Sequence, residues 1–216
     1  MKFKTNKNGI IKRNEPKVIG IFIDGVELDR ATRRVNKKIN VKELLKTLSL
    51  GIVPTVVRYY TLIPYEDDSR HRAYLDAVED AGFQVVVKRL PPKGVNRQVL
   101  VDTEMASDIV AFAFGYNNFS LINDLDAKGE LIRNLTLDNK LDNKLNNKNA
   151  SLTDSSVKKV INLVCPSKEL TYAISLANTQ NTETITADFG KIKANQDILK
   201  SASKWIDLSD SETIWR

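Results

Sequence analysis

The sequence predicts an α/β protein with a mainly parallel central sheet flanked by helices. Apolar runs rich in β-branched and aromatic residues recur along the chain, as is typical of strands buried on both faces. Between them lie segments whose apolar residues have helical spacing, so strands and helices alternate. That alternation is the pattern of a parallel sheet with helical connections. The predicted strands are 18–25, 55–63, 83–88, 160–164, 183–186 and 205–208.

Composition and charge favour a single domain with a modest basic excess. The chain has 216 residues, with 33 Lys and Arg against 27 Asp and Glu, for a net charge of +6. This balance is compatible with a polyanionic partner without requiring one. The single Cys165 excludes an intramolecular disulfide, and with the lone His71 it cannot build a zinc site. No apolar run approaches the roughly 20 residues of a membrane span, so we expect a cytoplasmic protein.

The first predicted strand, 18–25 (VIGIFIDG), ends in an acid and a glycine. Asp24 would lie at the carboxyl end of this strand, where open α/β sheets bind their ligands. Gly25 would let the backbone turn out of the strand without a Cβ penalty. An ordinary Asp-Gly turn explains the pair equally well, so other acids are needed to make Asp24 a site residue.

Basic residues gather in two segments near the predicted strand ends. They either form a solvated surface or bind phosphates close to Asp24. The first segment holds Arg30, Arg33, Arg34, Lys37 and Lys38, and the second is a proline-containing loop with Lys93 and Arg97. Residues 1–16, also rich in Lys, are expected to form a flexible basic arm.

Capping residues and glycines set the bounds of the first predicted helices. Asn40 is expected to cap a helix over 41–48, with Glu43 as its capping-box partner. A polar helix over 67–81 follows the second strand and ends at Gly82.

A further helix is predicted from Asp102 onward, because DTEMASDIVAFAF has its apolar residues at helical spacing. Asp102 is a good N-cap for that helix, which is the structural alternative to a role in a site. Glu104 and Asp108 are four residues apart, so they lie on one face of the same helix.

Residues 116–156 differ in composition from the rest of the chain. They contain LDNK, LDNK and LNNK in tandem, within a polar stretch that buries too little apolar surface to offset the entropy of ordering. We therefore predict a flexible insertion that splits one domain, formed by 17–115 and 157–210. Beyond the insertion we expect helices over 170–176 and 192–201.

Acidic residues collect at the predicted carboxyl edge of the sheet. Asp24 follows the first strand, Asp102 begins a helix and Glu169 follows the fourth strand. Clustered carboxylates repel one another unless a cation neutralises them, and oxygen ligands suit Mg²⁺ or Mn²⁺. Such a cation could activate water for phosphodiester hydrolysis. One His and one Cys in unrelated segments offer no nucleophilic catalytic set.

Three segments together resemble the NYN domain, the PIN-like ribonuclease fold of the LabA-like proteins: VIGIFIDG, LVDTEMASDIV and VINLVCPSKELTYAI. The resemblance covers 17–114 and 157–208, and it implies a three-layer sandwich with metal-dependent endonuclease activity on RNA. The catalytic residues that it implies are Asp24, Asp102, Asp108 and Glu169, of which the first three would bind the metal. We expect the basic residues of both segments to bind the RNA.

The chain departs from the family pattern at two positions. Glu27 stands where the family usually has Asn, and Ser167, followed by Lys168, stands where the family has an acid. The sequence therefore leaves three functions open: a metal-dependent endoribonuclease, a catalytically inactive RNA-binding or protein-interaction regulator, and an interaction protein without nucleic acid contact. A homodimer, and a protein partner bound by 116–156, are left open as well.

Overall fold

A computed structural model describes residues 4–5, 11–12, 17–49, 51–66, 69–116, 157–190 and 195–215. The predicted insertion lies outside the described residues, apart from its first residue. The predicted basic arm also lies outside them, apart from two short strands, β1 (Lys4–Thr5) and β2 (Ile11–Lys12), which pair antiparallel.

The central feature is a six-stranded sheet in which every neighbouring pair of strands is parallel. The order across the sheet is β5-β4-β3-β6-β7-β8. This confirms the predicted α/β class, and the predicted strands agree with the observed ones to within a few residues. The strands are β3 (Lys17–Asp24), β4 (Val56–Ile63), β5 (Gln84–Arg89), β6 (Lys158–Val164), β7 (Thr182–Asp188) and β8 (Lys204–Asp207).

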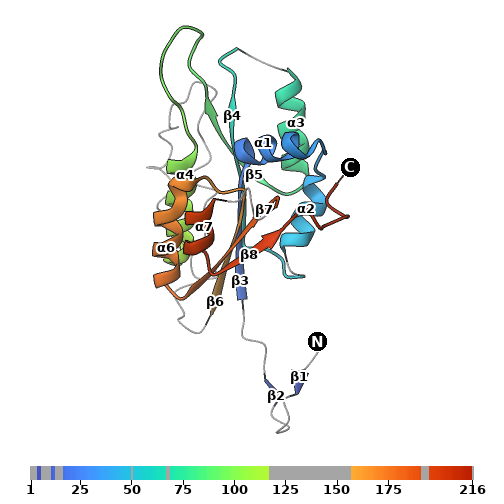
Figure 1. Ribbon diagram of the computed structural model, residues 1–216, viewed down its shortest axis with the longest axis vertical. Helices are drawn as coiled ribbons and strands as arrows, with labels where there is room; N and C mark the ends of the chain where they lie inside the picture. Colours follow the sequence, from blue (N-terminus) through green and yellow to red (C-terminus); the bar gives the residue numbers. More distant parts are fainter. Residues whose placement is uncertain are drawn as a thin grey trace, which may run out of the picture.

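Helices cover both faces of the sheet, which makes three layers (Figure 1). One face carries α1 (Gly25–Val35), α2 (Val41–Leu48) and α3 (Ser69–Asp80). The other carries α4 (Asp102–Ala113), α6 (Thr171–Thr179) and α7 (Gln196–Ser201), with the short 3-10 helix η4 (Lys168–Leu170) before α6. Helix α1 occupies the segment that the sequence analysis described only as basic.

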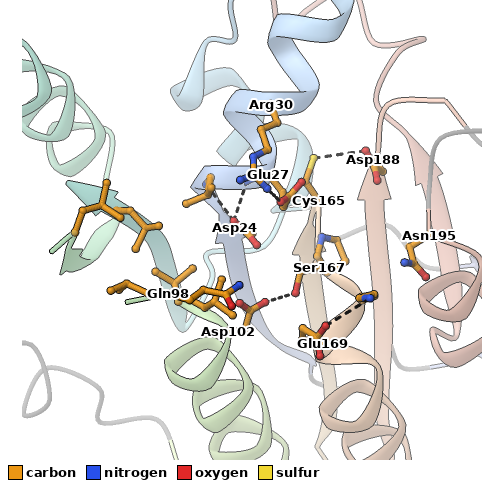
Figure 2. A pocket seen from close by; sticks show the side chains of 18 of the residues that line it. Asp24, Glu27, Arg30, Gln98, Asp102, Cys165, Ser167, Glu169, Asp188 and Asn195 are labelled. Atoms are coloured by element: carbon orange, nitrogen blue, oxygen red, sulfur yellow. Dashed lines mark hydrogen bonds and ion pairs between the residues drawn. The ribbon is translucent and has the colours of Figure 1, made fainter. Parts of the chain in front are cut away.

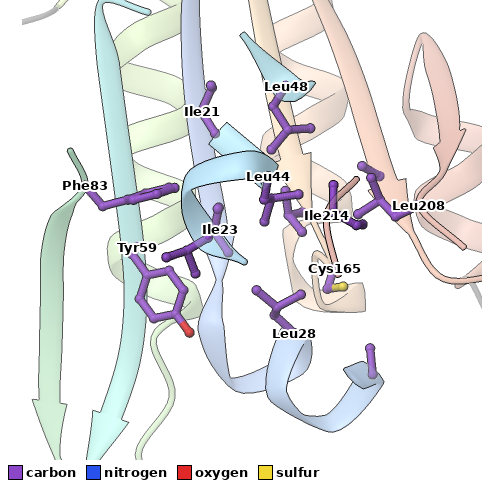
Figure 3. Close-up of a cluster of buried hydrophobic side chains, with 14 of the residues drawn as sticks. Ile21, Ile23, Leu28, Leu44, Leu48, Tyr59, Phe83, Cys165, Leu208 and Ile214 are labelled. Carbon is purple, nitrogen blue, oxygen red and sulfur yellow. The ribbon is translucent and has the colours of Figure 1, made fainter. Parts of the chain in front are cut away.

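Side chains alternating along β3 enter two separate cores. Ile19, Ile21 and Ile23 are fully buried against the layer of α1, α2 and α3 (Figure 3). Phe22 points to the opposite face and meets Phe112 of α4 edge to face, with ring centroids 6.0 Å apart. Each fully buried side chain of this size stabilises the fold by about 1.5–3 kcal/mol.

The start of α2 differs in one detail from the predicted capping box. The Asn40 side chain accepts hydrogen bonds from the backbone N–H groups of Lys42 and Glu43, as expected for an N-cap. Glu43 does not complete the box, because its carboxylate pairs with Lys46 at 2.6 Å. The backbone N–H of Asn40 donates instead to the carbonyl of Ile214 near the chain end, at 2.7 Å.

The strand order creates a topological switch point beside β3. The chain runs outward from β3 through β4 to β5, then returns to pair β6 with the other side of β3 and continues to β7 and β8. Connections leave β3 and β6 in opposite directions, which opens a crevice beyond their carboxyl ends. The acids predicted at strand ends belong to this edge.

Candidate active site

A pocket of about 650 Å³ lies at the carboxyl ends of β3, β6 and β7 (Figure 2). The loop between β5 and α4, one edge of α1 and the start of η4 complete its walls. Its position at the switch point and its volume are those of an ordinary ligand site in an α/β protein. Asp24, Asp102 and Glu169, three of the predicted acids, all line it.

Asp24, the last residue of β3, is a buried acid at the base of the pocket. Its side chain is 3% exposed, and its Oδ1 accepts hydrogen bonds from the backbone N–H groups of Val26 and Glu27, each at 3.0 Å. These bonds cap α1, so the alternative role as a turn and cap residue is also real. Burial raises the pKa of Asp24 to about 7, and the negative charges of Glu27 and Asp102 add to the rise. A bound cation would stabilise the ionised carboxylate here.

Gly25 is required for close packing, which is a different reason from the predicted turn. Its φ is not in the left-handed region, and it is the first residue of α1. A Cβ at this position would overlap the ring of Tyr59. The glycine thus lets α1 start directly against β4, with Asp24 at the start of the helix.

Asp102 is the first residue of α4, and its carboxylate does not cap the helix. The cap position is Val101, where no side chain bonds the helix N–H groups. The Oδ1 of Asp102 instead accepts a hydrogen bond from the hydroxyl of Ser167 (Figure 2). Ser167, which stands where an acid was expected, therefore holds Asp102 by its hydroxyl.

Asp108 lies apart from the pocket. Its Oδ2 accepts a hydrogen bond from the Tyr60 hydroxyl at 2.6 Å and forms an ion pair with Arg58 at 3.1 Å. Burial raises the pKa of Asp108, while Tyr60 and Arg58 oppose that rise. A separation of six residues places Asp108 about 120° around the helix from Asp102 and about 9 Å along it. The geometry of α4 itself thus separates two acids that the sequence analysis grouped.

The structure accordingly brings two of the three predicted metal ligands together. Asp24 and Asp102 face the same pocket (Figure 2). In the described part of the chain, no three Asp, Glu, His or Cys side chains converge closely enough to form a metal-binding group by themselves.

Comparison with known families gives a match over the part of the chain that carries Asp24 and Asp102. Residues 18–124 match the NYN domain. NYN domains bind RNA, belong to the PIN-like nuclease superfamily and generally use divalent metals. The matched residues end before Ser167 and Glu169, so the second half of the pocket lies outside the match.

The fold is also similar to that of a solved structure. A crystal structure of a Vibrio parahaemolyticus protein of unknown function has a TM-score of 0.63 and 9% sequence identity, covering 95% of this chain and 99% of that one. At this identity the likeness concerns the fold alone. Comparison with curated proteins gives no match. Among the described residues, no helix combines the length and apolar character of a membrane span.

The predicted basic residues divide into two groups. Arg30, Arg34 and Arg97 line the pocket, and Arg30 also forms an ion pair with Glu27. The others lie outside the pocket lining: Arg33 pairs with Asp29 at 2.9 Å, Lys37 lies 4.9 Å from the ring centroid of Trp215, and Lys38 and Lys93 are exposed. Of the predicted basic residues, those at the pocket therefore come from one edge of α1 and from the loop before α4.

Glu169 and Lys168 of η4 lie at the rim of the pocket. Both side chains are mostly exposed, and Lys168 Nζ lies 3.9 Å from Glu169 Oε1 (Figure 2). Glu104, by contrast, lies outside the pocket lining, and its carboxylate forms an ion pair with Lys88 at 2.8 Å.

Sequence reasoning missed Asp188, the last residue of β7, which also lines the pocket. Its Oδ1 accepts hydrogen bonds from the Phe189 N–H at 2.7 Å and from the Cys165 thiol at 3.6 Å. The signal was present, because an acid at a strand end had identified Asp24. The predicted strand ended at residue 186, however, which left Asp188 in a loop. Cys165 itself is buried, as expected for a core residue, and burial raises the pKa of its thiol.

Proposed function

We propose that this chain is a metal-dependent endoribonuclease whose divalent cation is held by Asp24 and Asp102. The observation that carries the proposal is the pair of carboxylates facing one pocket, one of them buried with a pKa of about 7. Burial beside like charges is unfavourable for the protein alone and becomes favourable when a cation is present. The NYN domain match supports RNA as the substrate.

The donor set fits Mg²⁺ or Mn²⁺. These ions prefer oxygen ligands, and Mg²⁺ in particular is usually held by one or two carboxylates together with water and substrate phosphate. A third protein acid is therefore not required. When bound, the cation would activate a water molecule and stabilise the leaving oxygen of the phosphodiester.

The remaining pocket residues have roles that follow from their charge and bonding. Arg30, Arg34 and Arg97 would hold the RNA phosphates by charge-assisted hydrogen bonds. The Ser167 hydroxyl donates a hydrogen bond to Asp102 Oδ1 and so fixes the orientation of that carboxylate. Asp108 would act indirectly, by holding α4 against β4 through Arg58 and Tyr60.

A second candidate function is a catalytically inactive NYN-domain protein that binds RNA as a regulator. The replacement of an acid by Ser167, with the cation of Lys168 beside it, favours this alternative. The resemblance to LabA-like proteins and a cytoplasmic location are compatible with either function.

Cleavage assays with a matched pair of variants test the proposal. Labelled structured and unstructured RNAs would be incubated with Mn²⁺, Mg²⁺ or EDTA and with the wild type, Asp24→Asn or Asp29→Asn. Asp29 is an exposed α1 acid outside the pocket lining, so its variant controls for charge. We expect cleavage that requires the metal, is lost in Asp24→Asn and is retained in Asp29→Asn. RNA binding that persists in EDTA without cleavage under any metal would instead establish the inactive regulator.

A further inference from the structure

The pocket has two chemically different sides. Arg30 and Arg34 of α1 and Lys168 of η4 give one side its positive charge. The other side is formed by Leu62 and by the loop between β5 and α4, and it is mainly aliphatic. The loop contributes Leu90, Arg97, Gln98, Val99, Leu100 and Val101, and Arg97 is the one charged side chain that it adds to the lining. A purely phosphate-binding pocket has no need of this aliphatic side.

The aliphatic side is open to solvent. Leu90 is 38% exposed and Leu100 is 44% exposed, so apolar surface faces the pocket where a ligand could cover it. Gln98 is also exposed and lies on the same side of the pocket as Asp102 (Figure 2). Its amide provides both donors and an acceptor beside the two leucines.

The loop that carries this side is fixed at both ends. At its start, the Leu90 N–H donates to the carbonyl of Ile63 at 2.8 Å. At its end, the Nζ of Lys88 donates to the carbonyl of Leu100 at 2.8 Å and also pairs with Glu104 of α4. A loop held in this way presents its side chains without a large ordering cost on binding.

We propose that the aliphatic side binds the base of a nucleotide next to the phosphate at Asp24 and Asp102, and that Gln98 reads its edge. Leu90 and Leu100 would pack on the face of the base, while the Gln98 amide would form hydrogen bonds with its polar edge. Phosphate contacts position a nucleic acid, whereas base contacts specify its sequence. Unpaired RNA bases are accessible to such contacts, so the site selects single-stranded RNA by base identity. This inference rests on the proposed binding of RNA in the pocket.

Binding measurements in EDTA test base selection separately from cleavage. Fluorescently labelled single-stranded hexamers that differ only in one central base would be titrated with each protein and followed by anisotropy. The test variant is Gln98→Ala, and Asn96→Ala is the matched control, since Asn96 is an exposed amide in the same loop outside the pocket lining. Arg97→Ala serves as a phosphate-contact variant, and circular dichroism melts verify folding.

We expect the wild type to prefer one base over the poorest by about tenfold, the discrimination typical of an amide pairing with a base. Gln98→Ala should reduce that preference to less than about twofold, whereas Asn96→Ala should keep it. Arg97→Ala should weaken binding to all hexamers by a similar factor. Equal wild-type affinity for all four bases, or a preference that survives Gln98→Ala, would overturn the inference.

The outcomes separate this inference from the proposed function. Base-selective binding that depends on Gln98, in a protein that never cleaves RNA, would uphold the base site and overturn only the nuclease. Cleavage without any Gln98-dependent preference would uphold the nuclease and overturn the base site. Failure of the wild type to bind any hexamer would overturn the base site, whereas the cleavage assay alone decides the nuclease.

Discussion

Asp24 and Asp108 are both buried acids, 3% and 6% exposed, yet their surroundings are opposite. Asp108 is bonded to the guanidinium of Arg58 and the hydroxyl of Tyr60. Asp24 is bonded to backbone N–H groups, and the charges that act on it most are those of two further acids, Glu27 and Asp102. One buried charge is neutralised within the fold, whereas the other would be neutralised by a ligand. Burial alone therefore does not distinguish a structural acid from a candidate site acid. The sign of the neighbouring charges does.

The largest expected effect concerns the stability of Asp108→Ala. This substitution leaves the charge of Arg58 buried without its carboxylate, which costs about 3–5 kcal/mol of unfolding free energy. Urea denaturation followed by circular dichroism measures the loss, and Asp29→Ala on the surface of α1 is the control. An Asp108→Ala protein with native stability but without cleavage would break the comparison, because Asp108 would then act in the site.

Asp24→Asn is expected to raise the free energy of unfolding, the opposite of the effect of Asp108→Ala. Burial raises the pKa of Asp24 from 3.8 to about 7, so between these values the folded protein binds a proton that the unfolded chain has released. Wild-type stability therefore falls as pH rises from about 4 to about 7, by about 4 kcal/mol at most. Asn keeps the helix cap without the charge. Asp24→Asn should thus be the more stable protein at pH 8 in EDTA, with the difference vanishing near pH 4. Equal pH dependence of urea unfolding in the two proteins would contradict the raised pKa.

The third prediction sharpens the comparison by supplying the missing acid. Ser167→Asp should place a third carboxylate beside Asp102 and increase the stabilisation that Mn²⁺ gives. A cation present at 100 times its dissociation constant stabilises the folded state by about 2.7 kcal/mol, and tenfold tighter binding adds about 1.4 kcal/mol. Thermal melts with and without Mn²⁺ measure the shift, and Ser167→Asn is the uncharged control. Equal Mn²⁺ shifts in the wild type and both variants would mean that Ser167 does not face the cation.

The sheet was predictable because its strands carry their own signals. The run before Asp24 and the apolar runs of β4, β5 and β6 are β-branched, and helix α2 has both its cap and its apolar stripe in sequence. Helix α1 was missed because its buried face is narrow and consists mainly of Leu28, Ala31 and Thr32 among many charges. When few residues of a helix are apolar, their helical spacing is hard to detect among the charged residues.

The position of the candidate site could be predicted from the sequence, but the full set of residues that form it could not. Strand ends identified Asp24 and the turn of Glu169, since the edge of a parallel sheet follows from its connectivity. Asp108 lies outside the pocket because α4 turns this residue toward β4. There it forms an ion pair with Arg58, which is 50 residues away in sequence. Such contacts, including the hydrogen bond from Ser167 to Asp102, depend on tertiary packing and cannot be predicted from local sequence patterns.

The pairing of β3 with β6 also has a consequence for the time at which the pocket forms. Asp24 and Asp102 lie in the first half of the chain, but Ser167 and Asp188 follow β6, which a ribosome finishes only after residue 164. At about 5–20 residues per second, several seconds separate the synthesis of Asp102 from that of Asp188. Until β6 joins β3, the nascent chain carries two aspartates without the wall that completes their pocket.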